Sequence, residues 1–268
     1  MQASLHIIPI ILYLCCGWLL LIKLTRPALI QSVTRQHILP LAAIAILLHG
    51  GALYLNLFTD AGLNIHFYNV LSLVAWLVAL LLSLTAITMR IECLGAIVYP
   101  FAALGLALAL APAEPQLLAY HMKSGMLAHI LLSILAYSLL SIAAVQALLL
   151  YIQDLHLHNK HPGGFIRALP PLETMEVLMF RIIGLGFIVL SIALLTGMFY
   201  LQDMFAQHIV HKTILSLIAW LLFAVLLWGR WQFGWRGRIA IRWTYSGFIL
   251  LMLAYFGSKF VIEQVLNR

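Results

Sequence analysis

The eleven histidines of this 268-residue chain are the residues best suited to chemistry, because the sequence offers few other polar groups. Only 9% of the residues are charged, whereas 64% are hydrophobic. A neutral imidazole is a good axial ligand for haem iron, and an ionisable side chain inside a membrane is by default a functional candidate. The candidate cofactor ligands are His129, His211, His49 and His66.

His129 and His211 lie toward the side of the membrane that we predict to face outward, as does His66. His129 shares a helical face with Ser133 and Ala136, so its side chain is expected to point into a helix bundle. There it could bind a cofactor or form a hydrogen bond to a neighbouring helix. His211 flanks a short outer loop, where a solvated side chain is the common alternative to a ligand.

The other two candidates have equally plain structural alternatives. His49 precedes Gly50-Gly51, a pair that would also permit close approach of two helices. His66, Asn69 and Trp76 follow helical spacing along one face, which indicates either polar packing or the wall of a cavity.

A further group, His156, His158 and His161, has a spacing that could bind a divalent metal. Asp154 is the one acid nearby and no thiolate accompanies the group, so a solvated inner loop between Gln153 and Glu176 is the preferred interpretation. Glu173 and Glu176 follow two prolines and are interpreted as carboxylates of a first helical turn. No nucleophile with a base, P-loop or HExxH motif is present, and we expect no enzymatic activity.

The elements that must position these side chains are membrane-spanning helices. A mean hydropathy of +1.06 is far from that of a soluble domain. Apolar runs of about 17–25 residues predict an all-α, polytopic bundle of about eight helices, forming a single transmembrane domain over residues 1–268. The predicted spans are Leu5–Ile22, Ile38–Phe58, Tyr68–Met89, Leu94–Ala111, Gly125–Ile152, Val177–Tyr200, Thr213–Trp228 and Ile239–Val261.

The distribution of basic residues predicts the orientation. Of the 15 Lys and Arg residues, eleven fall in alternate loops on one side, and the other side holds Lys123, Lys212, Lys259 and Arg268. The positive-inside rule then places both termini outside. The net charge of +7 forms no continuous basic stripe, so no nucleic-acid partner is expected. Cys15 and Cys16 are adjacent, and we infer no disulfide framework.

Several stretches resemble the cytochrome c assembly membrane proteins, the CcsA and HemX-like group. The resemblance covers most of residues 125–257, while the first four spans match only as hydrophobic architecture, most like the YpjD-type branch of small bacterial inner-membrane proteins. Its residues are Leu169-Pro170-Pro171-Leu172-Glu173, Arg181-Ile182-Ile183, Phe187, Leu195-Thr196-Gly197, Gly234-Trp235-Arg236-Gly237-Arg238 and Tyr255-Phe256-Gly257, preceded by the helix from His129 through Tyr137 to Gln146.

This resemblance implies a multi-pass protein of the bacterial inner membrane that handles haem. His129 matches the first outer histidine of the family, and outer Lys123 and Lys212 could meet haem propionates. The loop Gln202–His211 contains no Trp, and Trp228 stands where the family has a histidine, so the full haem lyase platform is missing. The resemblance therefore implies a protein that binds haem b, or a haem-free accessory subunit of a partner membrane protein.

Overall fold

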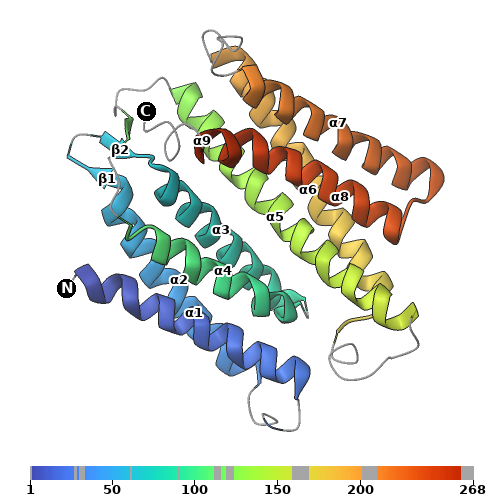
Figure 1. The fold of residues 1–268 in the computed structure, drawn as a ribbon, viewed down its shortest axis with the longest axis horizontal. Helices are drawn as coiled ribbons and strands as arrows, with labels where there is room; N and C mark the ends of the chain where they lie inside the picture. The colour runs from blue at the N-terminus through green and yellow to red at the C-terminus, as the bar shows by residue number, and fades with distance from the viewer. Residues whose placement is uncertain are drawn as a thin grey trace. The chain divides into compact units, whose positions relative to one another are not determined.

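The computed structural model describes residues 2–26, 29, 34–60, 62–89, 91–111, 116–118, 124–158, 169–200 and 210–260. Most of these residues are helical, which confirms the predicted all-α, multi-pass membrane fold. The chain divides into two compact units, Met1–Tyr120 with Leu155–Pro171, and His121–Asp154 with Leu172–Arg268. Figure 1 shows the helices of both units.

The N-terminal unit is a closed ring of four helices. They are α1 (Gln2–Thr25), α2 (Arg35–Leu57), α3 (Phe67–Thr88) and α4 (Gly95–Leu108). Each helix packs on the next, and α4 returns to pack on α1. Gly17 permits this last contact, because a Cβ at that position would lie 2.6 Å from Cγ of Pro100.

The fourth predicted span is shorter than expected. It is made of η2 (Glu92–Leu94), a 3-10 turn, and the 14 residues of α4. Among the described residues, seven helices are long and apolar enough to cross a membrane, and Glu92–Leu108 is an eighth, shorter apolar segment. A helix of 14 residues is about 21 Å long, less than the roughly 30 Å of a bilayer core.

A small antiparallel sheet closes one end of the N-terminal unit. Its strands are β1 (Phe58–Thr59), β2 (Gly62–Asn64) and β3 (Leu117–Leu118), in that order. Leu63 of β2 pairs with Phe58 on one side and Leu118 on the other. The sequence pattern did not predict these strands, because two or three residues are too few for an alternating pattern to be recognised.

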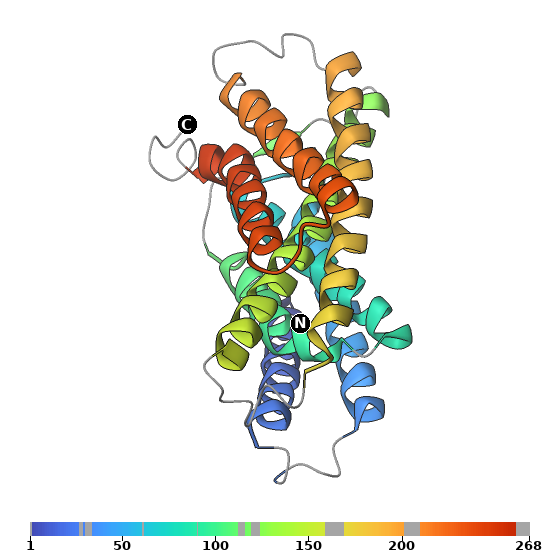
Figure 2. The same ribbon diagram turned by 90° about the vertical axis from the view of Figure 1, so that its right-hand side faces the viewer.

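The C-terminal unit contains the four longer helices of the second half of the chain. They are α5 (Ser124–His158), which belongs to this unit up to Asp154, α6 (Leu172–Tyr200), α7 (Val210–Phe233) and α8 (Arg238–Met252). Helix α8 continues through η4 (Leu253–Gly257), a π-helical turn, into α9 (Ser258–Phe260). After Gly237, whose φ of +59° suits glycine, the chain turns back and α8 packs along α7 (Figures 1 and 2).

Helices α5 and α6 run antiparallel, and three contacts fix their register. His129 of α5 meets Ala193, Leu140 meets Gly186, and Gln146 meets Met175. Gly186 makes the close approach possible, because a Cβ there would lie 2.9 Å from the buried Leu140 side chain. This pairing positions the backbone of α6 beside the first turns of α5.

The loop between α5 and α6 is shorter than predicted. It was expected from Gln153 to Glu176, but α5 continues to His158 and α6 begins at Leu172. His156 and His158 therefore lie on the last turn of a helix, about 200° apart around its axis, and do not share a face. His161 lies outside the described residues.

Candidate functional site

His129 is the candidate ligand with the clearest geometry. Its half-buried side chain extends from the second turn of α5, and its Nδ1 lies 2.7 Å from the backbone oxygen of Ala193 on α6. A carbonyl oxygen can only accept a hydrogen bond, so the Nδ1–H of His129 is the donor. In the neutral imidazole this assigns the lone pair to Nε2, the nitrogen that could bind a metal ion.

The carbonyl that receives this bond has a second donor. The hydroxyl of Thr196, also on α6, donates to the Ala193 oxygen at 2.8 Å. Gly125 lies one turn before His129, and a Cβ at Gly125 would be 2.4 Å from the ring of Tyr200 at the end of α6. The small residue lets the ends of the two helices approach each other beside the imidazole.

His49 has a different environment, in the N-terminal unit. Its side chain is fully buried, with Nε2 2.9 Å from the Ser72 hydroxyl and Nδ1 3.4 Å from the Tyr13 hydroxyl. Both ring nitrogens thus have protein partners. These contacts favour the packing role that the neighbouring glycines suggested, although a ligand role for His49 stays an untested prediction.

His66 caps the first turn of α3. Its Nδ1 accepts a hydrogen bond from the backbone N–H of Tyr68 at 3.4 Å, and its side chain is 6% exposed. On the same face, the Asn69 amide donates to the Asn64 and Asn56 carbonyl oxygens, and the Trp76 indole donates to a carbonyl of α2. These contacts describe polar packing between helices, one of the two alternatives that the sequence left open.

The remaining candidate ligand, His211, lies in the C-terminal unit. His211 is exposed in the first turn of α7, with Lys212 beside it. Lys123 and residues 201–209 lie outside the described part of the chain. Trp228 is 53% exposed and packs edge-on against Phe233, as expected for an aromatic residue at a membrane interface.

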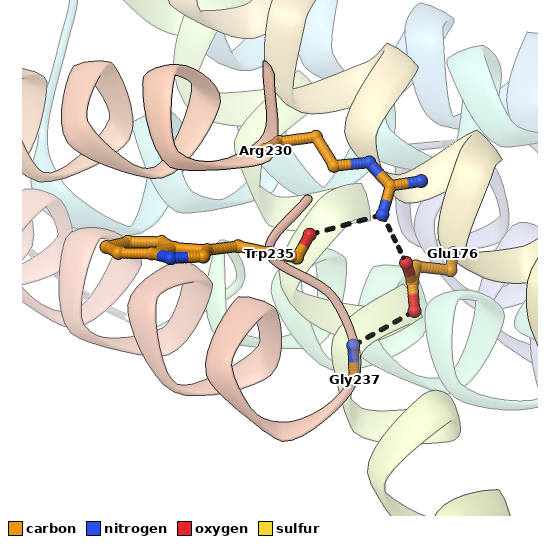
Figure 3. A network of polar contacts seen from close by, with 4 residues as sticks. All are labelled: Glu176, Arg230, Trp235 and Gly237. Carbon is orange, nitrogen blue, oxygen red and sulfur yellow. Dashed lines mark hydrogen bonds and ion pairs between the residues drawn. The ribbon is translucent and has the colours of Figure 1, made fainter. Parts of the chain in front are cut away.

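At the other end of α6, Glu176 is the centre of a polar cluster that the sequence did not predict (Figure 3). Its carboxylate accepts from Arg230 Nη1 at 2.8 Å and from the Gly237 backbone N–H at 3.0 Å. The same Arg230 nitrogen donates to the Trp235 carbonyl oxygen at 3.1 Å. The sequence placed Glu176 near the first turn of this helix, and α6 does begin at Leu172, but the pattern predicted none of these partners. Only 10% of the Glu176 side chain is exposed, and it joins α6 to the loop between α7 and α8.

The two polar sites of α6 differ in what they can do. Every oxygen of Glu176 has a donor from the protein, so this cluster is a structural clamp. The imidazole of His129 has one nitrogen held by the backbone and the other assigned as an acceptor, the arrangement usual for a metal-bound histidine. The Ala193 carbonyl gave no signal in the sequence, because a backbone acceptor is available at every residue.

Comparison with known proteins gives matches over most of the chain. A family model described as "Cytochrome C assembly protein" matches residues 36–266. The inner membrane protein YpjD of Escherichia coli K12 is 36% identical over 228 residues, covering 84% of this chain and 86% of that protein.

Two other relatives match shorter segments. An uncharacterised 28.8 kDa protein of Azospirillum brasilense is 33% identical over 141 residues, covering 52% of each chain. The cytochrome c biogenesis protein CcsA of Trichormus variabilis is 34% identical over 87 residues, covering 32% of this chain and 25% of that protein. No solved structure matches significantly.

Proposed function

We infer that this chain, which belongs to the cytochrome c assembly protein family, binds haem b near the outer leaflet of the bacterial inner membrane. We further propose that it handles haem without catalysing a bond change itself. The inner membrane location follows the name of its E. coli relative and agrees with seven apolar helices of spanning length in the described residues. Cytochrome c biogenesis is the activity named for its more distant CcsA relatives.

The observation that carries the proposal is the hydrogen bond from His129 Nδ1 to the Ala193 oxygen, at 2.7 Å. A histidine that ligates iron commonly donates its other ring N–H to a carbonyl, which fixes the tautomer and strengthens the ligand. His129 meets this requirement before any ligand is bound. His129 also lies in the first turns of α5, at the end of the helix that we predict to face outward. Haem could reach it there from outside the membrane.

When bound, haem would supply an iron centre that takes an imidazole as axial ligand. His129 would hold the iron through Nε2, and His211, in the same unit and exposed at the start of α7, is the proposed second ligand. The Lys212 ammonium group beside it would attract the negative charge of the propionates. The backbone of α6 would keep the imidazole of His129 in its ligating orientation.

The test is the visible spectrum of the detergent-purified protein, oxidised and dithionite-reduced, with a pyridine haemochrome assay for stoichiometry. The expected result is about one haem per chain with sharp reduced α and β bands, as two imidazole ligands give. His129→Ala should lose the haem, whereas His158→Ala, at the exposed inner end of α5, should retain it. Unchanged haem content and spectrum in His129→Ala would remove His129 from the site.

A second function is favoured by one observation from the sequence. The loop Gln202–His211 contains no Trp, although the family resemblance implies a Trp-rich haem platform there. A chain without that platform could act as a haem-free accessory subunit that stabilises a partner membrane protein. If the protein contains no haem after expression with ample haem supply, this second function becomes the preferred one, and isolation of the partner is the next experiment.

A further inference from the structure

The Ala193 carbonyl accepts two hydrogen bonds from side chains, one of them from another helix. Carbonyl groups in an α-helix point along the axis toward the N–H four residues later. The Nδ1 of His129, on the neighbouring helix α5, lies 2.7 Å from this oxygen. A carbonyl that tilts away from the axis is easier for such a side chain to reach.

Thr196 is placed where it could produce such a tilt. Its hydroxyl lies three residues further along α6 and donates to the Ala193 oxygen at 2.8 Å. Back-bonding by Ser and Thr hydroxyls competes with the regular helix bonds and often bends the helix locally. A donor placed at the side of the helix draws the oxygen away from the axis, where the imidazole of α5 can also reach it.

We propose that Thr196 is a positioning residue that turns the Ala193 carbonyl toward α5 and thereby holds His129 in its Nδ1–H tautomer, with Nε2 free to bind iron. The identity of the bound group rests on the proposed function. The effect of Thr196 on the imidazole does not, because both hydrogen bonds are made by the chain alone.

The experiment measures the tautomer of His129 directly. The full-length protein is labelled with 15N-histidine and studied by NMR in haem-free detergent micelles, at a pH where the imidazole is neutral. His129→Gln identifies the signals of this ring. In the wild type the shifts should report a protonated Nδ1 and an unprotonated Nε2. In Thr196→Val the ratio of the two tautomers should move toward Nε2–H, by at most about tenfold, which would be the effect of losing one typical hydrogen bond entirely.

Matched variants separate the hydroxyl from general disturbance. Thr196→Ser restores the donor and should return the wild-type ratio, and Thr196→Ala should repeat the result of Thr196→Val if the valine variant does not fold. Thr244→Val is the control. Thr244 is fully buried in α8 of the same unit, and its hydroxyl donates to the carbonyl oxygen of Ala240, four residues earlier, at 2.8 Å. Its described bond involves no histidine. It should leave the His129 ratio unchanged.

Haem binding gives the second readout. Loss of a group that orients a metal ligand lowers metal affinity by roughly 10–100-fold, and Thr196→Val should fall at the low end, about tenfold, because it acts through the carbonyl. A wild-type tautomer ratio in both Thr196→Val and Thr196→Ala would overturn the inference, whether or not the haem affinity changes. A shifted ratio in a protein that never binds haem would support the role of Thr196 and overturn the proposed function.

Discussion

Removing the Glu176 carboxylate should destabilise the C-terminal unit far more than breaking the exposed ion pair of the same unit. The Glu176 side chain is 10% exposed, and it accepts one bond from Arg230 and one from the Gly237 N–H. Loss of one partner from a buried pair costs about 3–5 kcal/mol. Because the Arg230 side chain is 33% exposed and keeps its bond to the Trp235 carbonyl, the low end applies, and Glu176→Ala should cost about 3 kcal/mol.

The assay is the free energy of unfolding in mixed micelles, measured by SDS titration with circular dichroism. Arg238→Gln is the internal control. It breaks the Arg238–Asp154 pair, whose side chains are 50% and 31% exposed, and should lower the free energy of unfolding far less than Glu176→Ala, because solvent screens an exposed pair. Glu176→Gln keeps the shape but loses one of the two bonds, at about 1.5 kcal/mol. If Glu176→Ala and Arg238→Gln cost the same, the interpretation of Glu176 as a buried clamp is refuted.

Two further predictions concern packing within each unit and use the same assay. Gly247→Leu should lower the free energy of unfolding by about 1–3 kcal/mol more than Gly184→Leu does. A Cβ at Gly247 would lie 2.9 Å from the buried ring of Phe223, whereas a Cβ at Gly184 would meet no atom within 4 Å. Equal losses in the two variants would show that the Phe223 ring can move aside. Ser72→Ala should lower the free energy of unfolding by about 1–3 kcal/mol, because it removes the hydrogen-bond partner of Nε2 of the fully buried His49. An unchanged free energy would mean that this nitrogen does not depend on Ser72.

The fold was predictable to the extent that the length of the apolar runs in the sequence determines it. Hydrophobic runs predicted the apolar helices in the correct order, because a helix in lipid must satisfy its backbone internally. The helix ends were less predictable. The run Leu94–Ala111 is apolar throughout, but its helix covers only Gly95–Leu108, since the first three residues from Glu92 form a 3-10 turn. The C-terminal end of α5 was missed for the opposite reason, because polar residues up to His158 continue the helix beyond the apolar run.

The sequence predicted which type of residue forms the candidate site, but not the hydrogen-bond partners of that residue. The sequence singled out His129 because few ionisable residues fall within the spans. It could not identify Ala193 as the acceptor, because backbone carbonyls look alike in a sequence and the contact depends on the register of α5 against α6. The partners of Glu176 were missed for a related reason. Its partner Arg230 lies 54 positions away, and a first-turn carboxylate already had a sufficient local explanation in the helix dipole.

The number of histidines in a sequence therefore says less about a cofactor site than the hydrogen-bond partners of each ring nitrogen do. His49 is the more deeply buried residue, yet both of its nitrogens are engaged by hydroxyls within the N-terminal unit. His129 is less buried, but its single described bond goes to a carbonyl, and that bond determines which nitrogen keeps its lone pair. A hydroxyl partner can donate or accept and leaves the tautomer open, whereas a carbonyl decides it. For this reason α6 contributes to the proposed site through its backbone as well as its side chains.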